Sequence, residues 1–574
     1  MRLHNDYLRS RVRYPRQTFG AVAKSGEKTA LQFRTHAPKT WARALAAVFA
    51  ITPAMLLSGC MMVGPDYQTP EAPVSDKWLG WREKADKGAI DHRAWWRVFH
   101  DPALDRLIEM ASEQNLTLMS AGARVLQARA ELGVAIGDLY PQQQQGQGLL
   151  RNERMSQAIP LGAGGASNTL RTFWLDSLSM QAAWEIDIWG KFRRGVESAD
   201  AAYLATIASY DDVLVTLLGD VASTYIGIRV LEKQIAIAEA NVVRQREVAR
   251  IARDRYEGGA ETLLDVHQAE NILANTEASV PRLKIQLNTG LNALRVLLGM
   301  PPQSLGFLLA RSTAKIPQPQ GKVSLGPPAD LLRRRPDIRA AELRAMAQSA
   351  QIGVAKAELL PAISITGTFG GLASNSYGHH LGEVVSPVGR AFAFGPSFKW
   401  NVLNYGQITN NVRLQDATLQ QYLIDYQNAV LKAQQEVENG IYTFRLSQSE
   451  AAFLQKGVRE AQEAVKIAII EYEQGSRDFT TMLNAQQYLY NTETSYAAAA
   501  GNASKGLVMI YRSLGGGWQI REGKTFLPAP VLQQMRARTD WGETLPADGS
   551  APAPSSNSLP RPEDVGPLLR LPEW

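Results

Sequence analysis

The sequence feature that most constrains the fold is an internal duplication. The segment Gly133–Pro141 recurs as Gly353–Pro361 at an offset of 220 residues, and Tyr256–Gly259 recurs as Tyr472–Gly475 at an offset of 216. Motifs that repeat in the same order predict two copies of one structural unit rather than several unrelated domains. We assign repeat 1 to 104–299 and repeat 2 to 330–515.

Each repeat contains one very long predicted helix, over about 190–257 and 406–473. Apolar residues follow one another every seven positions along both helices. The seam is formed by Leu214, Val221, Ile228, Ile235, Val242, Ala249 and Tyr256 in repeat 1 and by Val430, Val437, Phe444, Ala451, Val458, Val465 and Tyr472 in repeat 2. A period of seven predicts a left-handed coiled coil, because a straight helix drifts away from such a seam. At about 1.5 Å per residue, each helix reaches about 100 Å.

The other elements follow the same order in both repeats. A first helix, over 104–137 or 329–359, ends shortly before a proline and is followed by two short strands. After the long helix, a glycine turn leads into a returning helix of about forty residues.

The predicted strands alternate apolar residues on one face with small or polar residues on the other. The apolar positions are Leu178, Met180, Ala182, Trp184, Ile186 and Ile188 in repeat 1 and Ile363, Ile365, Phe369, Phe392, Phe394, Phe398 and Trp400 in repeat 2. A period of two is typical of a strand with one buried or lipid-facing surface. Trp184, Phe398 and Trp400 are candidates for an aromatic girdle at a membrane interface. The first strand of repeat 1, 142–155, shows little alternation.

Four strands cannot close a barrel by themselves, since bacterial outer-membrane barrels begin at about eight strands. Three chains would supply twelve. The pattern therefore predicts a mostly α-helical chain whose four strands pool with those of other copies in a transmembrane β-barrel, of twelve strands if the assembly is trimeric, continued by a long coiled-coil barrel. A soluble α+β protein with two hairpins packed on helices is the alternative.

The N-terminal 59 residues predict a secretory signal, with a basic region, an apolar core and small residues before Cys60. Leu57-Ser-Gly-Cys60 looks like a bacterial lipobox, whose cysteine carries diacylglycerol and a fatty acyl group. Cys60 is the only cysteine, so an internal disulfide is excluded. Met61 follows it instead of the aspartate of inner-membrane retention, which implies the outer membrane.

The remaining segments flank and join the repeats. We expect 60–103, with its Trp95-Trp96 pair, the linker 300–329 and the start of 516–574 to pack around the middle of the helices. The Pro/Ser-rich end of the chain predicts disorder.

The formal charge of +6 gives no support to a nucleic-acid partner. Residues 1–59 hold ten Lys or Arg and two Asp or Glu, which leaves 51 basic and 53 acidic residues and a net charge of −2 in the mature chain. His-Glu-x-x-His, phosphate-loop and nucleophile-elbow motifs are lacking, so we expect neither an enzyme nor a metal or other cofactor.

Several motifs together resemble a known family. They are the lipobox followed by Val63–Pro70, Arg334–Ile338, Tyr472–Gly475 and the duplication itself. The chain resembles, over about 57–516, the TolC-like outer-membrane efflux channels in their lipoprotein (OprM-like, NodT-type) branch. The resemblance implies a homotrimer in outer-membrane lipid with a periplasmic tunnel. It also implies a periplasmic adaptor and an inner-membrane transporter of the resistance-nodulation-division (RND) type as partners.

The same resemblance implies a gate at the periplasmic ends of the helices. The matching positions are Asp265, Tyr472 and Arg477, where an Asp–Arg pair and a tyrosine hydroxyl would hold the tube closed. Asn484 stands where the family often has a carboxylate at the constriction, which puts a cation-binding ring in doubt. Tyr256 and Tyr472 also end the seam, so coiled-coil packing is at least as good an explanation as gating for Tyr256 and an equal one for Tyr472.

Two other functions remain open. The exit duct of a type I secretion system would have the same architecture and would deliver a different cargo. A periplasmic coiled-coil scaffold is the alternative from another class, but it accounts for neither the strand pairs nor their aromatic faces.

Overall fold

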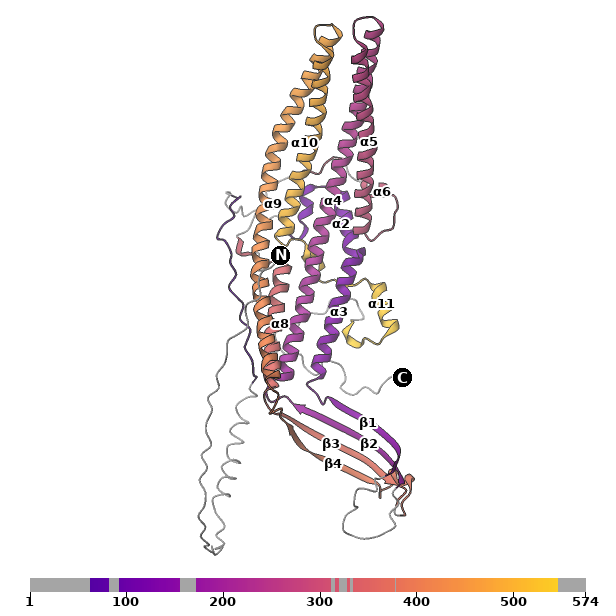
Figure 1. Cartoon of the computed structure of the whole chain (residues 1–574), viewed down its shortest axis with the longest axis vertical. Helices are drawn as coiled ribbons and strands as arrows, with labels where there is room; N and C mark the ends of the chain where they lie inside the picture. Colours follow the sequence, from indigo (N-terminus) through magenta and orange to yellow (C-terminus); the bar gives the residue numbers. More distant parts are fainter. Residues whose placement is uncertain are drawn as a thin grey trace, which may run out of the picture. The chain divides into compact units, whose positions relative to one another are not determined.

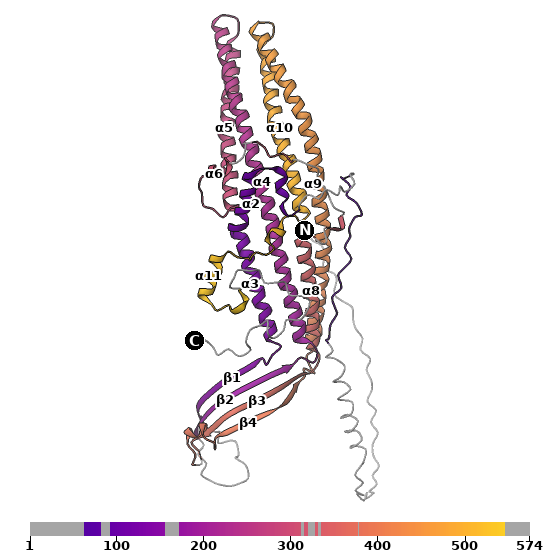
Figure 2. The same cartoon turned by 180° about the vertical axis from the view of Figure 1, so that it is seen from behind.

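The computed structural model describes residues 62–81, 92–154, 172–310, 315–319, 328–330, 334–376 and 378–545. Three predictions lie outside these residues: the signal segment, lipidation of Cys60 and the disordered C-terminal tail. The described chain is dominated by helices, with one antiparallel sheet of four strands (Figures 1 and 2).

The two repeats have matching element orders. Repeat 1 comprises α2 (Pro102–Gln114), α3 (Leu116–Gly137), β1 (Gln143–Arg154), β2 (Thr172–Ile186), α4 (Lys191–Glu257) and α5 (Leu263–Leu297). Repeat 2 comprises α8 (Pro336–Ala357), β3 (Ala362–Ser374), β4 (Arg390–Lys399), α9 (Gln407–Glu473) and α10 (Phe479–Ser513). Shorter elements are η1 (His92–Phe99), α6 (Gly306–Leu309), η2 (Pro328–Asp330), η3 (Leu381–Val385), η4 (Trp518–Arg521), α11 (Ala529–Arg538) and η5 (Gly542–Thr544).

The predicted long helices are confirmed almost to the residue. Helices α4 and α9 both have 67 residues, and the returning helices α5 and α10 both have 35. The lengths coincide because the heptad seam and the flanking glycines were duplicated together.

The first helix differs from its prediction in both repeats. In repeat 1 it is broken into α2 and α3 at Asn115, whose side chain accepts a hydrogen bond from Leu118 N and donates one to the Leu297 carbonyl. An asparagine with such local bonds ends one helix and caps the next. In repeat 2 the helix begins at Pro336 instead of Ala329, because proline suits the first helical turn and the preceding Arg335 is extended.

The sheet has the order β1-β2-β3-β4, so β2 and β3 join the two repeats. Residues paired across the sheet lie on one face, and the register places Trp184 opposite Ile365, and Ile365 opposite Pro396. The predicted apolar positions therefore share one surface. The other surface carries small and polar residues, namely Gln145, Gln147, Ser179, Gln181, Ser364, Thr366, Thr368 and Ser397. β1 forms despite its weak alternation because it pairs with β2 along its whole length.

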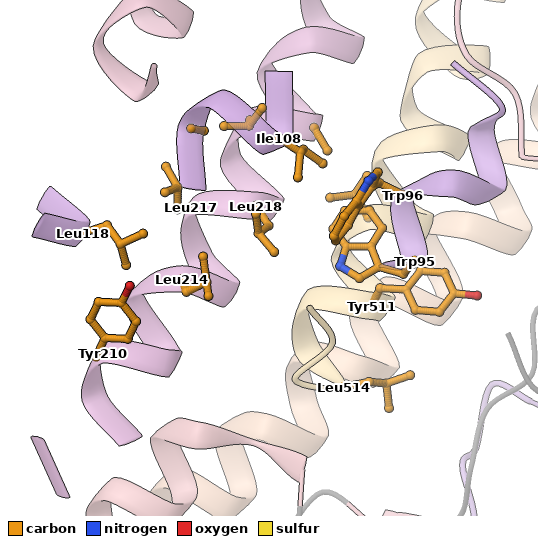
Figure 3. Packing of buried hydrophobic residues seen from close by; sticks show 14 of the residues in the cluster. Trp95, Trp96, Ile108, Leu118, Tyr210, Leu214, Leu217, Leu218, Tyr511 and Leu514 are labelled. Carbon is orange, nitrogen blue, oxygen red and sulfur yellow. The ribbon is translucent and has the colours of Figure 1, made fainter. Parts of the chain in front are cut away.

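The main core lies where the first half of α4 meets α2, α10 and η1 (Figure 3). Trp95 is 1% exposed and stacks on Tyr511, with ring centroids 5.7 Å apart and planes 11° from parallel. The expectation that the Trp95-Trp96 pair packs against the middle of the helices is thus met. The seam on α4 is buried from Leu214 to Ile235, whereas Tyr256 at its end is exposed. Coiled-coil packing of Tyr256 against a neighbouring helix pair stays a prediction.

Helix α4 includes an 18-residue window apolar and long enough to cross a membrane, but 61% of that window is buried inside the protein. Burial against other helices explains its apolar character without a lipid environment.

Candidate functional site: the sheet junction and the hairpin tips

Two tryptophans fasten the sheet to the helices. Trp184 Nε1 donates to the Leu139 carbonyl at 3.2 Å, and Trp400 Nε1 donates to the Leu359 carbonyl at 3.0 Å. Both rings remain substantially exposed on the apolar face, as does Phe398. A ring with an apolar body and a satisfied N–H suits the boundary between lipid and water. The arrangement fits the predicted girdle, which stays a prediction.

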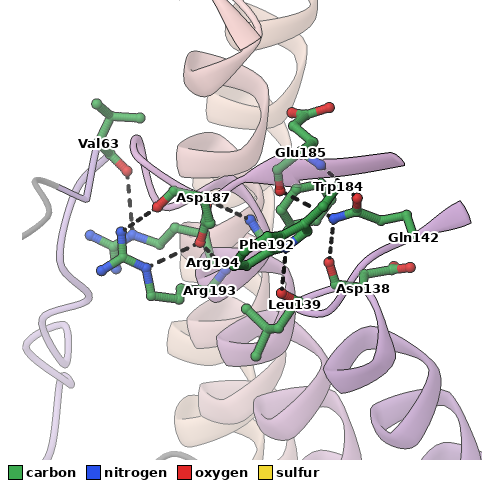
Figure 4. A network of polar contacts seen from close by, with 10 residues as sticks. All are labelled: Val63, Asp138, Leu139, Gln142, Trp184, Glu185, Asp187, Phe192, Arg193 and Arg194. Atoms are coloured by element: carbon green, nitrogen blue, oxygen red, sulfur yellow. Dashed lines mark hydrogen bonds and ion pairs between the residues drawn. The ribbon is translucent and has the colours of Figure 1, made fainter. Parts of the chain in front are cut away.

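The N-terminal segment is clamped at the same junction (Figure 4). The buried Arg194 of α4 donates to the Val63 carbonyl at 3.3 Å and forms ion pairs with Asp66 and Glu197, both at 2.7 Å. Gly64 has φ +108° and lies so close to Gly353 that a side chain at either position would meet backbone. These contacts explain the Val63-Gly-Pro-Asp motif, which the sequence identified only as a family signature.

Beyond this clamp, the rest of the described segment 62–81 runs along α9. Ser75 N donates to Gln434 Oε1 at 2.9 Å, and Gly80 N donates to Glu438 Oε2 at 3.1 Å. At its start, Val63 N donates to the Trp189 carbonyl at 3.0 Å. The described chain therefore begins beside the sheet, at the first turn of α4.

The tips of the two helical hairpins have the same turn geometry. Gly259 and Gly475 adopt φ +76° and +72°, and the residue after each donates back to the helix it leaves. This left-handed conformation ends a helix readily only at glycine.

The predicted gate residues have different partners from those expected. Asp265 forms a capping box with Thr262 at the start of α5, and Arg477 pairs with Glu471 at 3.2 Å. Within the single described chain the structure thus does not bring Asp265 and Arg477 together. Asn484 is exposed on α10. A role for these residues in the gate stays a prediction.

Tyr472 is the predicted gate residue that the structure places between the hairpins. Its ring is fully buried, with the Arg255 guanidinium of α4 4.8 Å from the ring centre. Arg255 Nη1 also donates to the Tyr472 carbonyl at 2.8 Å, and its Nε lies 3.4 Å from Glu261. Burial, helped by Glu261, raises the pKa of Tyr472 to about 12, so the hydroxyl stays neutral.

Sequence reasoning missed Arg255 and Glu261. Both lie next to the turn that the duplication identifies, but a charge near a helix end is usually solvated. Only the approach of the second hairpin gives Arg255 its partners.

A polar layer interrupts the apolar packing between α4 and α10, on the side of the tips that is nearer the sheet. Gln486 of α10 is 1% exposed, and neither of its side-chain polar atoms has a hydrogen-bond partner in the described part of the chain. The side-chain oxygens of Asn241 and Gln245 on α4 are in the same situation. Arg244 of α4 pairs with Glu493 of α10 at 3.2 Å in the same region. Buried polar atoms without partners lower stability.

No group of three or more His, Cys, Asp or Glu residues suited to a metal occurs among the described residues.

The chain is similar in sequence and structure to known proteins. Residues 107–300 and 328–516 match the family described as Outer membrane efflux protein. The chain belongs to this outer-membrane efflux protein family. Nodulation protein T of Rhizobium leguminosarum bv. viciae is 30% identical over 81% of this chain and 92% of its own. Pyoverdine export outer membrane protein OpmQ of Pseudomonas putida is 31% identical, over 77% and 92%.

The solved outer-membrane channel OprN has the same fold. It superposes with a TM-score of 0.73 at 31% identity, covering 80% of this chain and 99% of that one. This efflux protein is accordingly an outer-membrane channel with a periplasmic helical tunnel and no enzymatic activity. The expected fold class and location are confirmed: the sheet contributes to a transmembrane barrel, and the hairpins extend into the periplasm.

Proposed function

We propose that three copies of this chain form the exit duct of a tripartite RND-type pump. In this proposal, small solutes pass from a periplasmic adaptor and an inner-membrane transporter through the helical tunnel and out of the barrel. The observation that carries the proposal is the four-stranded sheet with one apolar surface, joined to two 67-residue helices. Such a sheet needs lipid on one side and partners at its edges.

The apolar surface supports insertion of the sheet into lipid. Phe392, Phe394 and Phe398 are about four-fifths exposed in the single chain. Exposed aromatic rows of this kind are too costly in water, whereas the glutamines and hydroxyl side chains of the opposite face suit a water-filled lumen.

The gate, in this proposal, lies where α4 and α9 end. Arg255 holds the tip of α9 to α4 through the Tyr472 ring and carbonyl. Asp265 and Arg477 are proposed to act between neighbouring hairpins of the trimer, since both lie at the tips, where Arg477 is exposed and Asp265 is partly exposed. Contacts of this size contribute about 1 kcal/mol each, which suits a latch that an adaptor opens.

Lipidation of Cys60 is part of the proposal. Cys60 lies three residues before Val63, whose backbone N–H donates a hydrogen bond to the Trp189 carbonyl beside the sheet. That position lets acyl chains enter the leaflet next to the barrel. Intact mass measurement of the purified mature protein tests this, because diacylglycerol and an acyl chain add a defined mass that Cys60→Ala lacks.

The names of the relatives point to no single cargo. Proteins named for nodulation and for pyoverdine export are similar to this chain to almost the same degree. We therefore propose small solutes as a class, delivered by the partner pump.

Planar-bilayer recording of the purified protein, with its mass in detergent determined by light scattering, tests the channel and the trimer. A trimer that gives discrete conductance steps is the expected result. A stable monomer, or a trimer that inserts but carries no current under any condition, would contradict the proposal.

A further inference from the structure

A cavity of about 540 Å³ lies between α4, α8, α9 and α10, far from the tips. Its wall includes Asp212 and Val215 of α4 and Lys505, Val508 and Met509 of α10. Volumes of this order accommodate drug-sized molecules, usually against an apolar wall with a few polar groups.

Two residues of the cavity, Asp212 and Met509, lie on different faces of their helices from the residues that contact η1 and η4. On α4, Leu218 meets η4 at Gly517, and Asp212 lies six residues earlier, about 120° around the helix. On α10, Tyr511 stacks on Trp95 of η1, and Met509 lies about 160° away from it. In a tube that carries η1 and η4 on its outside, Asp212 and Met509 are therefore turned toward the lumen.

Most charges around the cavity are already neutralised. Arg335 pairs with Asp337 at 2.6 Å and with Glu436 at 2.8 Å, and Arg512 pairs with Asp220 at 3.0 Å. Two charged groups are left over.

Those two groups, Asp212 and Lys505, form no ion pair with any residue that the structure describes. Lys505 Nζ lies against Gly227 of α4, which is 15 residues, or about 22 Å, beyond Asp212. Val215, Val508 and Met509 form an apolar wall of the same cavity. A half-buried carboxylate that forms no ion pair, with Val215 one turn along the same helix, is suited to a cation with an apolar body.

We propose that this cavity binds amphiphilic organic cations during passage, with the charged group beside Asp212 and the apolar body running past Val215 toward Val508 and Met509. The inference deepens the proposed function, on which it rests, by naming a class of cargo and a wall site for it. Lys505 sets the orientation, because a second positive charge on the far end of the solute would approach its ammonium group.

The titration of Asp212 supplies an independent readout. Burial raises the pKa of Asp212 to about 6, and Asp337 and Glu436 add to the effect while Arg335 and Arg512 oppose it. Asp212 is thus ionised at pH 8 and mostly protonated at pH 5. Binding of a permanently charged cation should weaken between these pH values.

The test is calorimetric titration of the solubilised wild-type trimer with hexyltrimethylammonium, whose own charge is independent of pH. We expect saturable binding at pH 8 that becomes about tenfold weaker at pH 5. Asp212→Asn should bind about tenfold more weakly at pH 8 and lose the pH dependence, whereas Asp212→Glu should retain binding. The matched control is Asp425→Asn, an exposed charge on α9 outside the cavity, which should bind as the wild type does.

Equal affinity for wild type and Asp212→Asn, or no saturable binding to the folded wild-type trimer, would overturn the inference. This failure is distinct from failure of the proposed function, because a trimer that conducts in bilayers without binding hexyltrimethylammonium keeps the channel and loses only the site.

Discussion

The Arg255 guanidinium lies 4.8 Å from the centre of the Tyr472 ring, and its Nη1 donates 2.8 Å to the Tyr472 carbonyl. Arg255 belongs to the last turn of α4, and Tyr472 to the last turn of α9. One side chain thus holds the two hairpins together at the tips by a cation–π contact and a hydrogen bond.

Removal of this contact should loosen the closed end. We expect Arg255→Met to raise the single-channel conductance or the open probability in planar bilayers, because the side chain keeps its apolar stem but loses the contact with Tyr472. The matched control is Arg253→Met, since Arg253 pairs with Glu270 inside the α4–α5 hairpin. Equal conductance of both variants and the wild type would show that Arg255 does not take part in closure.

The pair proposed between neighbouring hairpins is tested separately. Asp265→Ala combined with Arg477→Ala should raise conductance if the two groups meet across the trimer. Asp265 also caps α5, so the control is Thr262→Ala, which removes the capping box and leaves the carboxylate. Loss of the cap should cost about 1 kcal/mol of stability without opening the channel. A double variant that conducts like the wild type rules out the latch.

The polar layer between α4 and α10 should be suboptimal for stability. Gln486→Leu removes two buried polar atoms that have no partner among the described residues. We expect it to stabilise the protein by about 1 to 2 kcal/mol, seen as a higher Tm of the trimer. Gln487→Leu, at the adjacent exposed position, is the control and should give no gain. A lower Tm for Gln486→Leu would mean that the layer is satisfied in the assembled channel.

The raised pKa of Asp212 makes a prediction for stability as well as for binding. A carboxyl group whose pKa is about 6 in the folded state and 3.8 unfolded binds protons more tightly when folded. Its ionisation therefore destabilises the fold fully above pH 6, and the effect disappears below about pH 4. Asp212→Asn should raise the free energy of unfolding at pH 8 by at most about 3 kcal/mol per chain, seen as a higher Tm, and should leave the Tm unchanged at pH 4. A gain that is the same at both pH values would contradict the assigned titration.

Much of this fold could be predicted because its patterns are local and duplicated. The heptad seams gave the positions of α4 and α9, and the alternation from Ile363 to Phe369 gave β3, since a helix and a strand each expose one face at a fixed period. Sequence periodicity did not predict the break at Asn115. That break depends on a hydrogen bond to Leu297, which is 182 residues away along the chain.

The sequence alone determined the repeats, the helix lengths and the apolar face of the sheet, because these depend on residues close together in the chain. Only the tertiary structure decided which charges have partners. Arg194 is buried on Val63 and Asp66, Arg255 meets Tyr472, and Asp212 stays unpaired in a cavity. From the sequence alone, a charged residue is expected to lie on the solvated surface. Only the approach of distant segments removes its water, and that approach is set by packing rather than by local pattern.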